Sequence, residues 1–268
     1  MSRQPHPLRA IVDDLHRLGV RHDDLLFVHA SLRAIGPVEG GAEGLIEALH
    51  EAVGPGGTLL MVLGARDDWA WVNQRPEADR PALLADAEPF DHLTTPADPD
   101  VGVLAEVFRH HPAALASDHP EGRFAAVGRL AAELTTDLPW NDYYGPGSPL
   151  ERFVNYHGRV LRLGADPDTV TLLHYAEYLT DVPNKRRARR HRLVAGPDGP
   201  ELRIVDCLDD STGIVDHPGE DYFITILNAY LATGRASRGT VGNAPSDLIA
   251  GADIVQFGTA WMAEHLGG

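Results

Sequence analysis

Apolar and polar positions in the first part of the chain follow two kinds of pattern. From Leu8 to Leu18 the apolar residues recur every three or four positions, which predicts an amphipathic helix that ends at Gly19. Short apolar runs without this period are typical of buried strands. The predicted order is a helix over 8–18, a strand over 24–30, a helix over 42–53 and a strand over 58–63. Strands joined by a helix of this length indicate a β-α-β unit, with parallel strands and helices packed on the sheet.

The periodic pattern is lost between Gly64 and Asp100, where Asp, Pro, Trp and Ala dominate. A stretch of this length without periodicity is either a long functional loop or a small lid. Beyond it the pattern predicts helices over 101–110, 149–156, 222–233 and 246–265, a strand over 159–163, an apolar stretch over 124–127, and a hairpin over 191–205 that turns at Gly196-Pro-Asp-Gly199. The chain has no internal repeat and no clear linker, so we expect one domain over 1–268 with a possible lid-like insertion at about 64–100.

The composition is that of a soluble globular protein with an acidic surface. Its 268 residues are 43% hydrophobic and include 39 acidic against 23 basic side chains, a formal net charge of −16. This charge argues against nucleic acids and anionic membranes as partners and suits a polycationic small molecule, although acidity alone more often serves solubility. No apolar run approaches a membrane span and the N-terminus has no signal-peptide core, so the expected location is cytoplasmic. The single cysteine, Cys207, excludes an internal disulfide framework.

The segment 168–177 places three reactive side chains three residues apart on a predicted helix. Thr171, His174 and Glu177 would then share one face. A hydroxyl, an imidazole and a carboxylate at this spacing are suited to proton transfer. Three interpretations of His174 remain open from the residues alone: a buried core histidine, a metal ligand paired with Glu177, and a general base. The metal interpretation has no H-E-x-x-H motif and no second such pair to support it.

Two kinds of irregular segment are suited to binding. The loop from His29 to Gly41 leaves a predicted strand and enters a helix, the position at which open α/β sheets bind ligands. Its free amides suit phosphate or amide groups, but it has neither the Walker nor the G-x-G-x-x-G pattern, so a simple glycine-rich turn is equally compatible. Acidic clusters in irregular segments, one of them beside Trp69 and Trp71, suit an amine-bearing sugar. The alternatives are solvated loop charge, which we expect for most of these acids, and packing of the two tryptophans onto the core. Ser148 lies in Gly-Ser-Pro and not in G-x-S-x-G, and a helix cap explains it better than a nucleophile.

A set of motifs resembles the aminoglycoside 3-N-acetyltransferases of the antibiotic N-acetyltransferase family. In order along the chain they are 28–42 (VHASLRAIGPVEGGA), 53–59 (VGPGGTL), 117–120 (SDHP), 147–149 (GSP), 163–164 (LG), 171–177 (TLLHYAE) and 183–185 (PNK). The resemblance runs from about Leu8 to Leu266. It implies an α/β fold with a mixed central sheet and helices on both faces, distinct from the GCN5-related acetyltransferases, whose R/Q-x-x-G-x-G/A pattern is absent.

The resemblance also implies an activity, namely transfer of acetyl from acetyl-coenzyme A (acetyl-CoA) to the 3-amino group of the 2-deoxystreptamine ring of aminoglycosides, and with it antibiotic resistance. Acetyl-CoA is the implied co-substrate, and no metal is implied. The implied catalytic residues are His174 as general base, Thr171, Asp221 and His29. The implied coenzyme A contacts are Ser31, Leu32, Arg33, Ile35, Gly36, Val38, Gly41, Ser148 and Thr171. The implied substrate contacts are Asp67, Asp68, Asp100, His119, Glu177, Asp209, Glu220 and Asp221. The acid that orients His174 stays open between Asp221, Glu220 and another carboxylate.

Only an unprotonated amine attacks a thioester. A neutral imidazole held by a carboxylate can accept the proton of the amine. Because Cys207 is isolated and no serine elbow is present, we expect direct transfer in a ternary complex without an acyl-enzyme. Three rivals remain: a metal-dependent hydrolase that uses His174, Glu177 and an acid of 206–221, a protein that binds aminoglycosides without catalysis, and an acetyltransferase of the same fold that acts on another amine. Monomer and homodimer are both compatible with the sequence.

Overall fold

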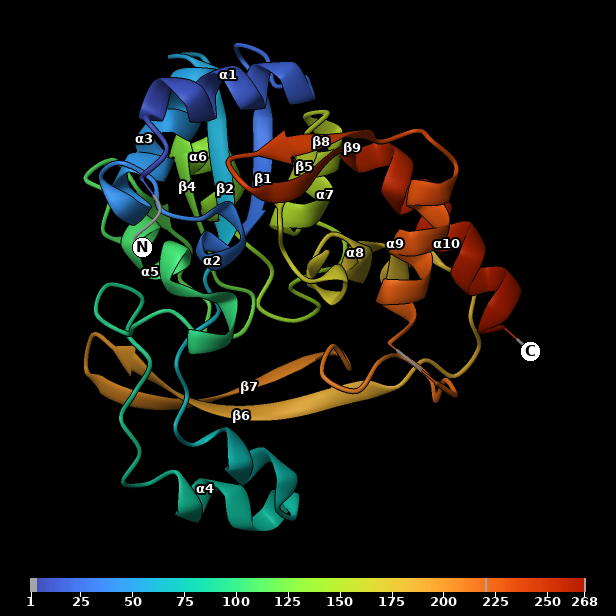
Figure 1. Cartoon of the computed structure of the whole chain (residues 1–268). Coiled ribbons are helices and arrows are strands. Elements are labelled where there is room, and N and C mark those ends of the chain that lie inside the picture. Colours follow the sequence, from blue (N-terminus) through green and yellow to red (C-terminus); the bar gives the residue numbers. More distant parts are fainter. Residues whose placement is uncertain (1–3, 220, 268) are drawn as a thin grey trace.

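A mixed sheet of seven strands forms the centre of the computed structural model, which describes residues 4–219 and 221–267 (Figure 1). The strands are β1 (Leu25–Ala30), β2 (Thr58–Val62), β3 (Leu115–Ala116), β4 (Phe124–Gly128), β5 (Arg159–Leu163), β8 (Ser237–Val241) and β9 (Ala244–Ala250). They lie in the order β3-β4-β2-β1-β5-β9-β8. The central strands β2, β1 and β5 are parallel, and the outer strands pair antiparallel. The predicted β-α-β unit is therefore confirmed at β1 and β2.

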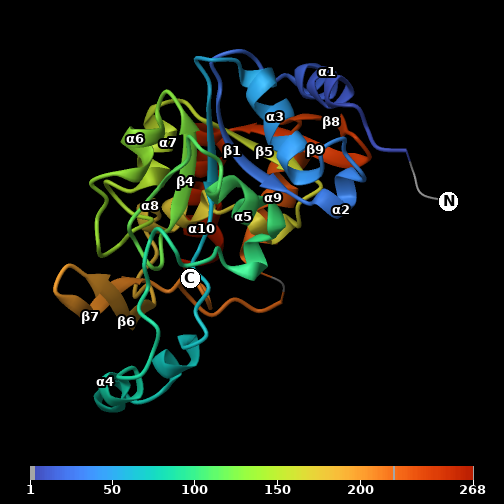
Figure 2. The ribbon, with the colours of Figure 1, turned by 90° about the vertical axis from the view of Figure 1, so that its left-hand side faces the viewer.

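Helices cover both faces of this sheet, as the resemblance implied (Figure 2). One core contains α1 (Leu8–Leu18), α3 (Gly41–Val53) and α5 (Val103–Arg109); the other contains α6 (Ala131–Thr135), α7 (Pro149–Asn155), α8 (Leu173–Leu179), α9 (Tyr222–Ala232) and α10 (Gly251–His265). Successive side chains of a strand point to opposite faces, so Phe27 joins the second core while Leu26 and Val28 join the first. Within the described ranges, no helix combines the length and the apolar character needed to cross a membrane.

Most elements with strong local signals begin and end within a few residues of the predicted bounds. The predicted helix over 246–265 is wrong, because residues 244–250 form strand β9 and only 251–265 are helical. Leu248 lies opposite Leu161 of β5, so pairing with a strand far away in the sequence decides the conformation of this segment. The predicted hairpin turn is confirmed, with longer strands than expected: β6 is Arg187–Gly196 and β7 is Gly199–Leu208.

The segment 64–101 consists of short helical turns attached to the β6–β7 hairpin. Its elements are η1 (Ala70–Gln74), η2 (Glu77–Asp79), α4 (Arg80–Leu83) and η3 (Pro99–Val101). Val72 and Leu84 pack against Leu193 of β6, and Phe90 exchanges two backbone hydrogen bonds of 2.8 Å with residues 193 and 195. Both views show α4 on the side of the hairpin that faces away from the central sheet (Figures 1 and 2). That this segment acts as a lid stays a prediction.

A row of alternating charges, here called the arginine ladder, joins three loops to strand β6. Arg190 and Arg192 lie two positions apart and therefore on one face of the strand. Glu121 stands between them, with its carboxylate oxygens 3.4 Å from an Arg190 nitrogen and 2.8 Å from Arg192 Nε. Asp67 pairs with Arg192 at one end, and Asp210 pairs with Arg190 at the other. All five side chains are at least four-fifths buried, so each charge depends on its neighbours.

We expect Phe27→Ala to lower the free energy of unfolding by about 3–5 kcal/mol, because it removes a ring from the centre of the second core. The Phe27 side chain is fully buried, and its ring lies 5.9 Å from that of Phe124 and 5.7 Å from that of Phe153. Chemical denaturation measures the loss. Leu93→Ala is the control, since Leu93 is 70% exposed. A loss for Phe27→Ala as small as that for the control would contradict the prediction.

We expect Arg192→Met to release the segment 64–101 from the hairpin. The substitution leaves the carboxylates of Asp67 and Glu121 without a cation between them, at a cost of about 3–5 kcal/mol. Limited proteolysis should then cut the segment 64–101 faster than in the wild type. Arg187→Met is the matched control on the same strand, because Arg187 makes a half-exposed ion pair with Asp142. Equal cleavage rates in the two variants would show that the ladder does not hold the segment.

Candidate active site

Helix α8 brings His174 and Glu177 together as a hydrogen-bonded pair. Residues three apart on a helix share a face, and His174 Nδ1 lies 2.8 Å from Glu177 Oε2. The Glu177 side chain is 2% exposed and that of His174 is 18% exposed. Thr171, predicted on the same helix, lies before its first residue in a turn closed by the His174 backbone N–H. The acid that orients His174 is therefore Glu177 and not Asp221.

The partner of Nδ1 determines the chemistry of the other ring nitrogen. A carboxylate accepts from Nδ1–H, so in the neutral imidazole Nε2 carries the lone pair. Among the described residues, Nε2 has no hydrogen-bond partner. The ring is held between Tyr144, which stacks on it at 4.9 Å and 10°, and Phe223, whose ring centre is 4.8 Å away. The arrangement holds a proton acceptor in a fixed direction.

Opposing effects act on the protonation of His174. Burial disfavours the charged imidazolium, but the Glu177 carboxylate favours it through its charge and its hydrogen bond. Asp210 and Asp221 add further negative charge. Together these carboxylates outweigh burial, and the pKa of His174 is raised above its ordinary value of 6.5.

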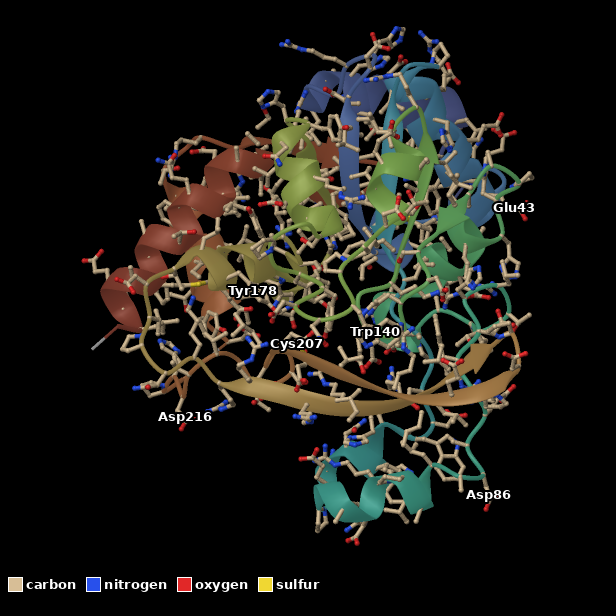
Figure 3. All side chains as sticks on the ribbon, turned by 180° about the vertical axis from the view of Figure 1, so that it is seen from behind. Glu43, Asp86, Trp140, Tyr178, Cys207 and Asp216 are labelled. Carbon is tan, nitrogen blue, oxygen red and sulfur yellow. The ribbon has the colours of Figure 1, made fainter. Side chains whose placement is uncertain are left out.

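Other elements hold α8 in place. The Tyr178 hydroxyl accepts a hydrogen bond of 3.0 Å from the Leu208 backbone N–H, which ties the helix to the end of β7. Figure 3 shows Tyr178 on α8 next to the strand that carries Cys207. The second oxygen of Glu177 accepts from the Tyr222 hydroxyl at the start of α9. The pair is thus fixed by three elements that are distant in sequence.

His174 opens into an acidic cavity of about 330 Å³. The cavity is lined by Asp168, His174, Glu177, Asp210, Ser211, Thr212, Gly213, Val215, His217, Gly219, Asp221, Tyr222 and Phe223. Asp221 combines two roles, because it also caps α9 by accepting a 2.8 Å hydrogen bond from the Phe223 N–H. Besides Glu177, which is paired with the imidazole, three carboxylates lie at the wall, and such a wall suits a ligand with several ammonium groups.

Most of the predicted coenzyme contacts come together in two adjoining grooves. A groove of about 530 Å³ is lined by the segment 28–33, by Asp100 and by Thr171 among others. A second, of about 550 Å³, is lined by Leu32, Arg33, Gly36, Pro37, Val38, Gly41 and Ala42. Thr171 lines the first groove and lies three residues before His174, so the groove and the acidic cavity approach each other at this turn. Asp100, predicted as a substrate contact, lies with the coenzyme candidates instead.

Two predicted coenzyme contacts lie elsewhere. Ile35 is fully buried in the first core, so its side chain faces away from the grooves. Ser148 is also fully buried, and its hydroxyl accepts from the Glu151 N–H as the cap of α7. We retain neither in the proposed site. The helix-cap interpretation of Ser148 is confirmed.

His29, at the end of β1, is 7% exposed and lines the first groove. Burial, together with the nearby positive charge of Arg162, lowers the pKa of His29 to about 3. The ring therefore stays neutral at working pH. Its Nε2 is buried, and no hydrogen-bond partner for it lies in the part of the chain that the structure describes. A neutral ring of this kind is suited to a polar contact with a molecule in the groove.

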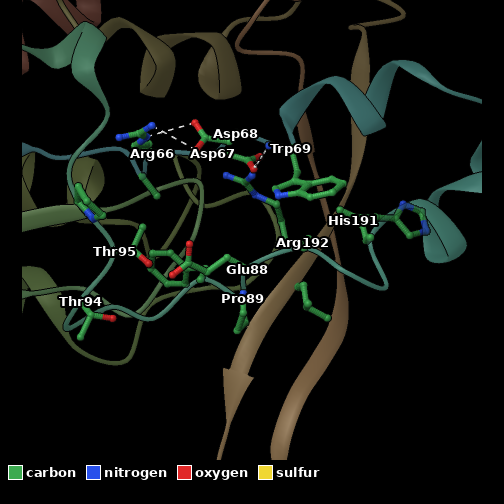
Figure 4. Close-up of a pocket in the computed structure, with 16 residues that line it drawn as sticks. Arg66, Asp67, Asp68, Trp69, Glu88, Pro89, Thr94, Thr95, His191 and Arg192 are labelled. Carbon is green, nitrogen blue, oxygen red and sulfur yellow. Dashed lines mark hydrogen bonds and ion pairs between the residues drawn. The ribbon is translucent and has the colours of Figure 1, made fainter.

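The predicted acids of the segment 64–101 are not beside His174. Asp67 pairs with Arg192 in the arginine ladder, and Asp68 is exposed and pairs with Arg66 at 3.2 Å. Both line a different cavity, of about 500 Å³, between this segment and β6 (Figure 4). The stacked pair Trp69 and Trp71 belongs to the same segment. Their use by a ligand stays a prediction.

The remaining predicted substrate contacts have structural partners. His119 accepts from the backbone N–H groups of Glu121 and Gly122 and donates to the Trp140 carbonyl at 2.8 Å, so both ring nitrogens are paired. Asp209 accepts from the backbone of 211–212 and does not line the cavity. We retain neither. Glu220 lies outside the described residues.

Several residues that contact His174 or line the cavity were not among the predicted site residues. They are Tyr144, Asp168, Asp210, Tyr222 and Phe223. Asp210 stands directly after Asp209 in an acidic run, and only the fold distinguishes the two. Tyr144 has no local signal, because its role depends on a ring contact with a residue of another element. Over the described ranges, no three side chains of His, Cys, Asp or Glu are grouped in a way that would hold a metal ion.

Comparison with known proteins places this geometry in a family. The family model described as aminoglycoside 3-N-acetyltransferase matches residues 27–263. Aminoglycoside N(3)-acetyltransferase III of Serratia marcescens is 42% identical over 271 residues, which cover 97% of this chain and 98% of that protein.

Solved structures agree with the sequence match. AAC-IIIb in binary complex with CoASH superposes with a TM-score of 0.92 at 36% identity, covering 98% of each chain. AAC-VIa bound to sisomicin superposes with a TM-score of 0.90 at 36% identity, covering 99% of this chain and 100% of the other. Fold, length and sequence therefore all match, and this chain belongs to the aminoglycoside 3-N-acetyltransferase family.

Proposed function

We propose that this enzyme acetylates the 3-amino group of the 2-deoxystreptamine ring of aminoglycosides, by direct transfer from acetyl-CoA with His174 as general base. The observation that carries the proposal is the buried His174–Glu177 pair, in which His174 Nε2 has no partner among the described residues and the pair lines a cavity walled by carboxylates. The co-substrate and substrate in this proposal are inferred from relatives. AAC-IIIb has been solved with CoASH and AAC-VIa with sisomicin. Acetylation removes the positive charge of one amine, and we propose antibiotic resistance as the result.

In the proposed step the amine nitrogen attacks the thioester carbonyl carbon. The N–C bond forms, the C–S bond breaks, and the amine proton passes to His174 Nε2. His174 then returns that proton to the sulfur of the departing coenzyme A. A general base in this position contributes about 10²–10⁴-fold in rate. Glu177 stabilises the imidazolium that exists between the two proton transfers.

The charges of the cavity select the substrate class in this proposal. Asp168 and Asp221 line the wall and would hold ammonium groups that do not react, whereas Asp210, also at the wall, is already paired with Arg190. The amine that reacts must instead be neutral, and it would lie against the imidazole. The cavity would thus distinguish the amines of one aminoglycoside by their position, since only one of them would lie next to His174.

Acetyl-CoA would occupy the two adjoining grooves along the segment 28–42. Thr171 would stand where the thioester meets His174, with His29 as a neutral polar contact on the opposite wall. Direct transfer is favoured by the state of the single thiol. Cys207 is 1% exposed, and burial raises its pKa to about 12, so it remains a thiol and a poor nucleophile.

His174→Ala should lower turnover by about 10²–10⁴-fold while acetyl-CoA binding is retained, because it removes the base without touching the grooves. The measurement is acetyl-CoA-dependent release of thiol with gentamicin, tobramycin, kanamycin, neomycin and apramycin. His265→Ala is the control, since His265 is an exposed residue at the end of α10. Near-wild-type turnover in His174→Ala would remove the base assignment. If folded enzyme that binds acetyl-CoA releases no thiol with any of these antibiotics, the substrate assignment is wrong.

The pH profile of kcat/KM should carry the signature of the raised pKa of His174. The base works only when neutral, so the rate should rise with pH through an apparent pKa above 6.5. Glu177→Gln removes the charge that raises this pKa and leaves burial, which lowers it. We therefore expect the acid limb of the profile to move to lower pH, with kcat reduced because an amide does not fix the ring tautomer.

The substrate amine titrates identically with both enzymes, so a difference between the two profiles reports the enzyme alone. An acid limb that stays in place after Glu177→Gln would show that Glu177 does not control the protonation of His174.

A further inference from the structure

The hydroxyl of Tyr222 stands between the catalytic pair and the acidic loop 209–219. It donates to Glu177 Oε1 and accepts from the Ile214 backbone N–H at 3.2 Å. The Tyr222 residue is 5% exposed, and burial and the charge of Glu177 raise its pKa, so the hydroxyl keeps its proton and acts as a donor. Both oxygens of Glu177 are thereby occupied, one by His174 and one by Tyr222.

The loop is shaped to fit the phenol ring. Gly213 has φ +84°, a left-handed conformation that favours glycine. A Cβ at this position would lie 2.9 Å from Tyr222 Cε1 and 3.1 Å from its hydroxyl oxygen. Ile214, the next residue, is fully buried in the second core and holds the loop backbone against the ring. A displacement of this loop therefore displaces the donor to Glu177.

We propose that Tyr222 is a positioning residue for acetyl transfer: its hydroxyl fixes Glu177, which fixes His174, and the acidic loop holds that hydroxyl in place through Ile214 and Gly213. The inference rests on the proposed role of His174 as base. It makes the loop that lines the substrate cavity part of the support of the base. A ligand that contacts the loop would then influence the orientation of the imidazole through the Tyr222 hydroxyl.

The sign of the expected pH effect follows from the charges around the pair. An O–H donor stabilises the Glu177 carboxylate, so its removal raises the affinity of the whole pair for a proton. The other charged or titratable groups that face the pair are Asp168, Asp210, Asp221, Tyr144, His217 and Lys185. Tyr222→Phe leaves all of these in place. The acid limb of kcat/KM should therefore move to higher pH, opposite to the shift expected for Glu177→Gln.

The test compares Tyr222→Phe with Tyr175→Phe. Tyr175 is a matched control: it lies on the same helix α8, is 7% exposed, and donates 2.8 Å to another glutamate, Glu151, away from the cavity. For Tyr222→Phe we expect kcat to fall about 10–100-fold, as for a lost hydrogen bond to a charged group, with KM for acetyl-CoA within about twofold of wild type. Tyr175→Phe should keep the wild-type kcat and pH profile.

Gly213→Ala supplies a second variant, which keeps the hydroxyl and displaces the loop that holds it. It should shift the acid limb to higher pH by a smaller amount than Tyr222→Phe. If Tyr222→Phe does not fold, this shift tests the proposal, and an acid limb that stays in place would overturn it. A purely structural role would lower the folded fraction and leave the limb of the remaining enzyme unmoved, which would overturn the proposal. Wild-type kcat in Tyr222→Phe, with His174→Ala inactive, would overturn it and leave the proposed function intact. An active His174→Ala would instead remove the proposed function.

Discussion

A buried carboxylate, Glu177, is the constraint on which the arrangement of the site depends. Taking a carboxylate out of water costs several kcal/mol unless hydrogen bonds and a nearby cation replace the lost hydration. Glu177 is 1% exposed, inside the core formed by α8, α9 and α10. His174 satisfies one oxygen and Tyr222 the other. The bond from Tyr222 brings the start of α9 against α8, and the acidic loop that precedes α9 then lines the same cavity as the imidazole.

Close packing on two sides of α8 holds the helix, and with it the His174–Glu177 pair, in place. Gly258 of α10 lies so near that a Cβ there would be 2.7 Å from the Leu173 side chain, so Leu173 of α8 packs directly against the backbone of α10. On the other side, Tyr178 is bound to the backbone of β7. These contacts fix the position of the His174 imidazole. A fixed imidazole suits the proposed reaction, in which a neutral amine and a thioester meet at one point.

Local signals made part of this structure predictable from the sequence. The period from Leu8 to Leu18 and the Ser148-Pro149 cap each lie within a single element, and both were found with near-correct bounds. The spacing of His174 and Glu177 also lies within one helix. By contrast, the donor to Glu177 comes from Tyr222, 45 residues later. Strand β9 forms because β5 is available as a partner. Asp67 looked free to bind an amine, but a buried arginine on β6 neutralises it.

The acids that suit the cavity to a polycation also act on the base. Asp210 and Asp221 raise the pKa of His174, and in the free enzyme this favours the imidazolium, which cannot accept a proton. In the proposed function an aminoglycoside would place an ammonium group beside Asp221 and offset its charge. The pKa of His174 then falls, and the neutral form becomes more abundant when the substrate is bound. If His174 is the base, as proposed, charge on the unreactive amines would serve catalysis as well as affinity, because it would favour the neutral imidazole.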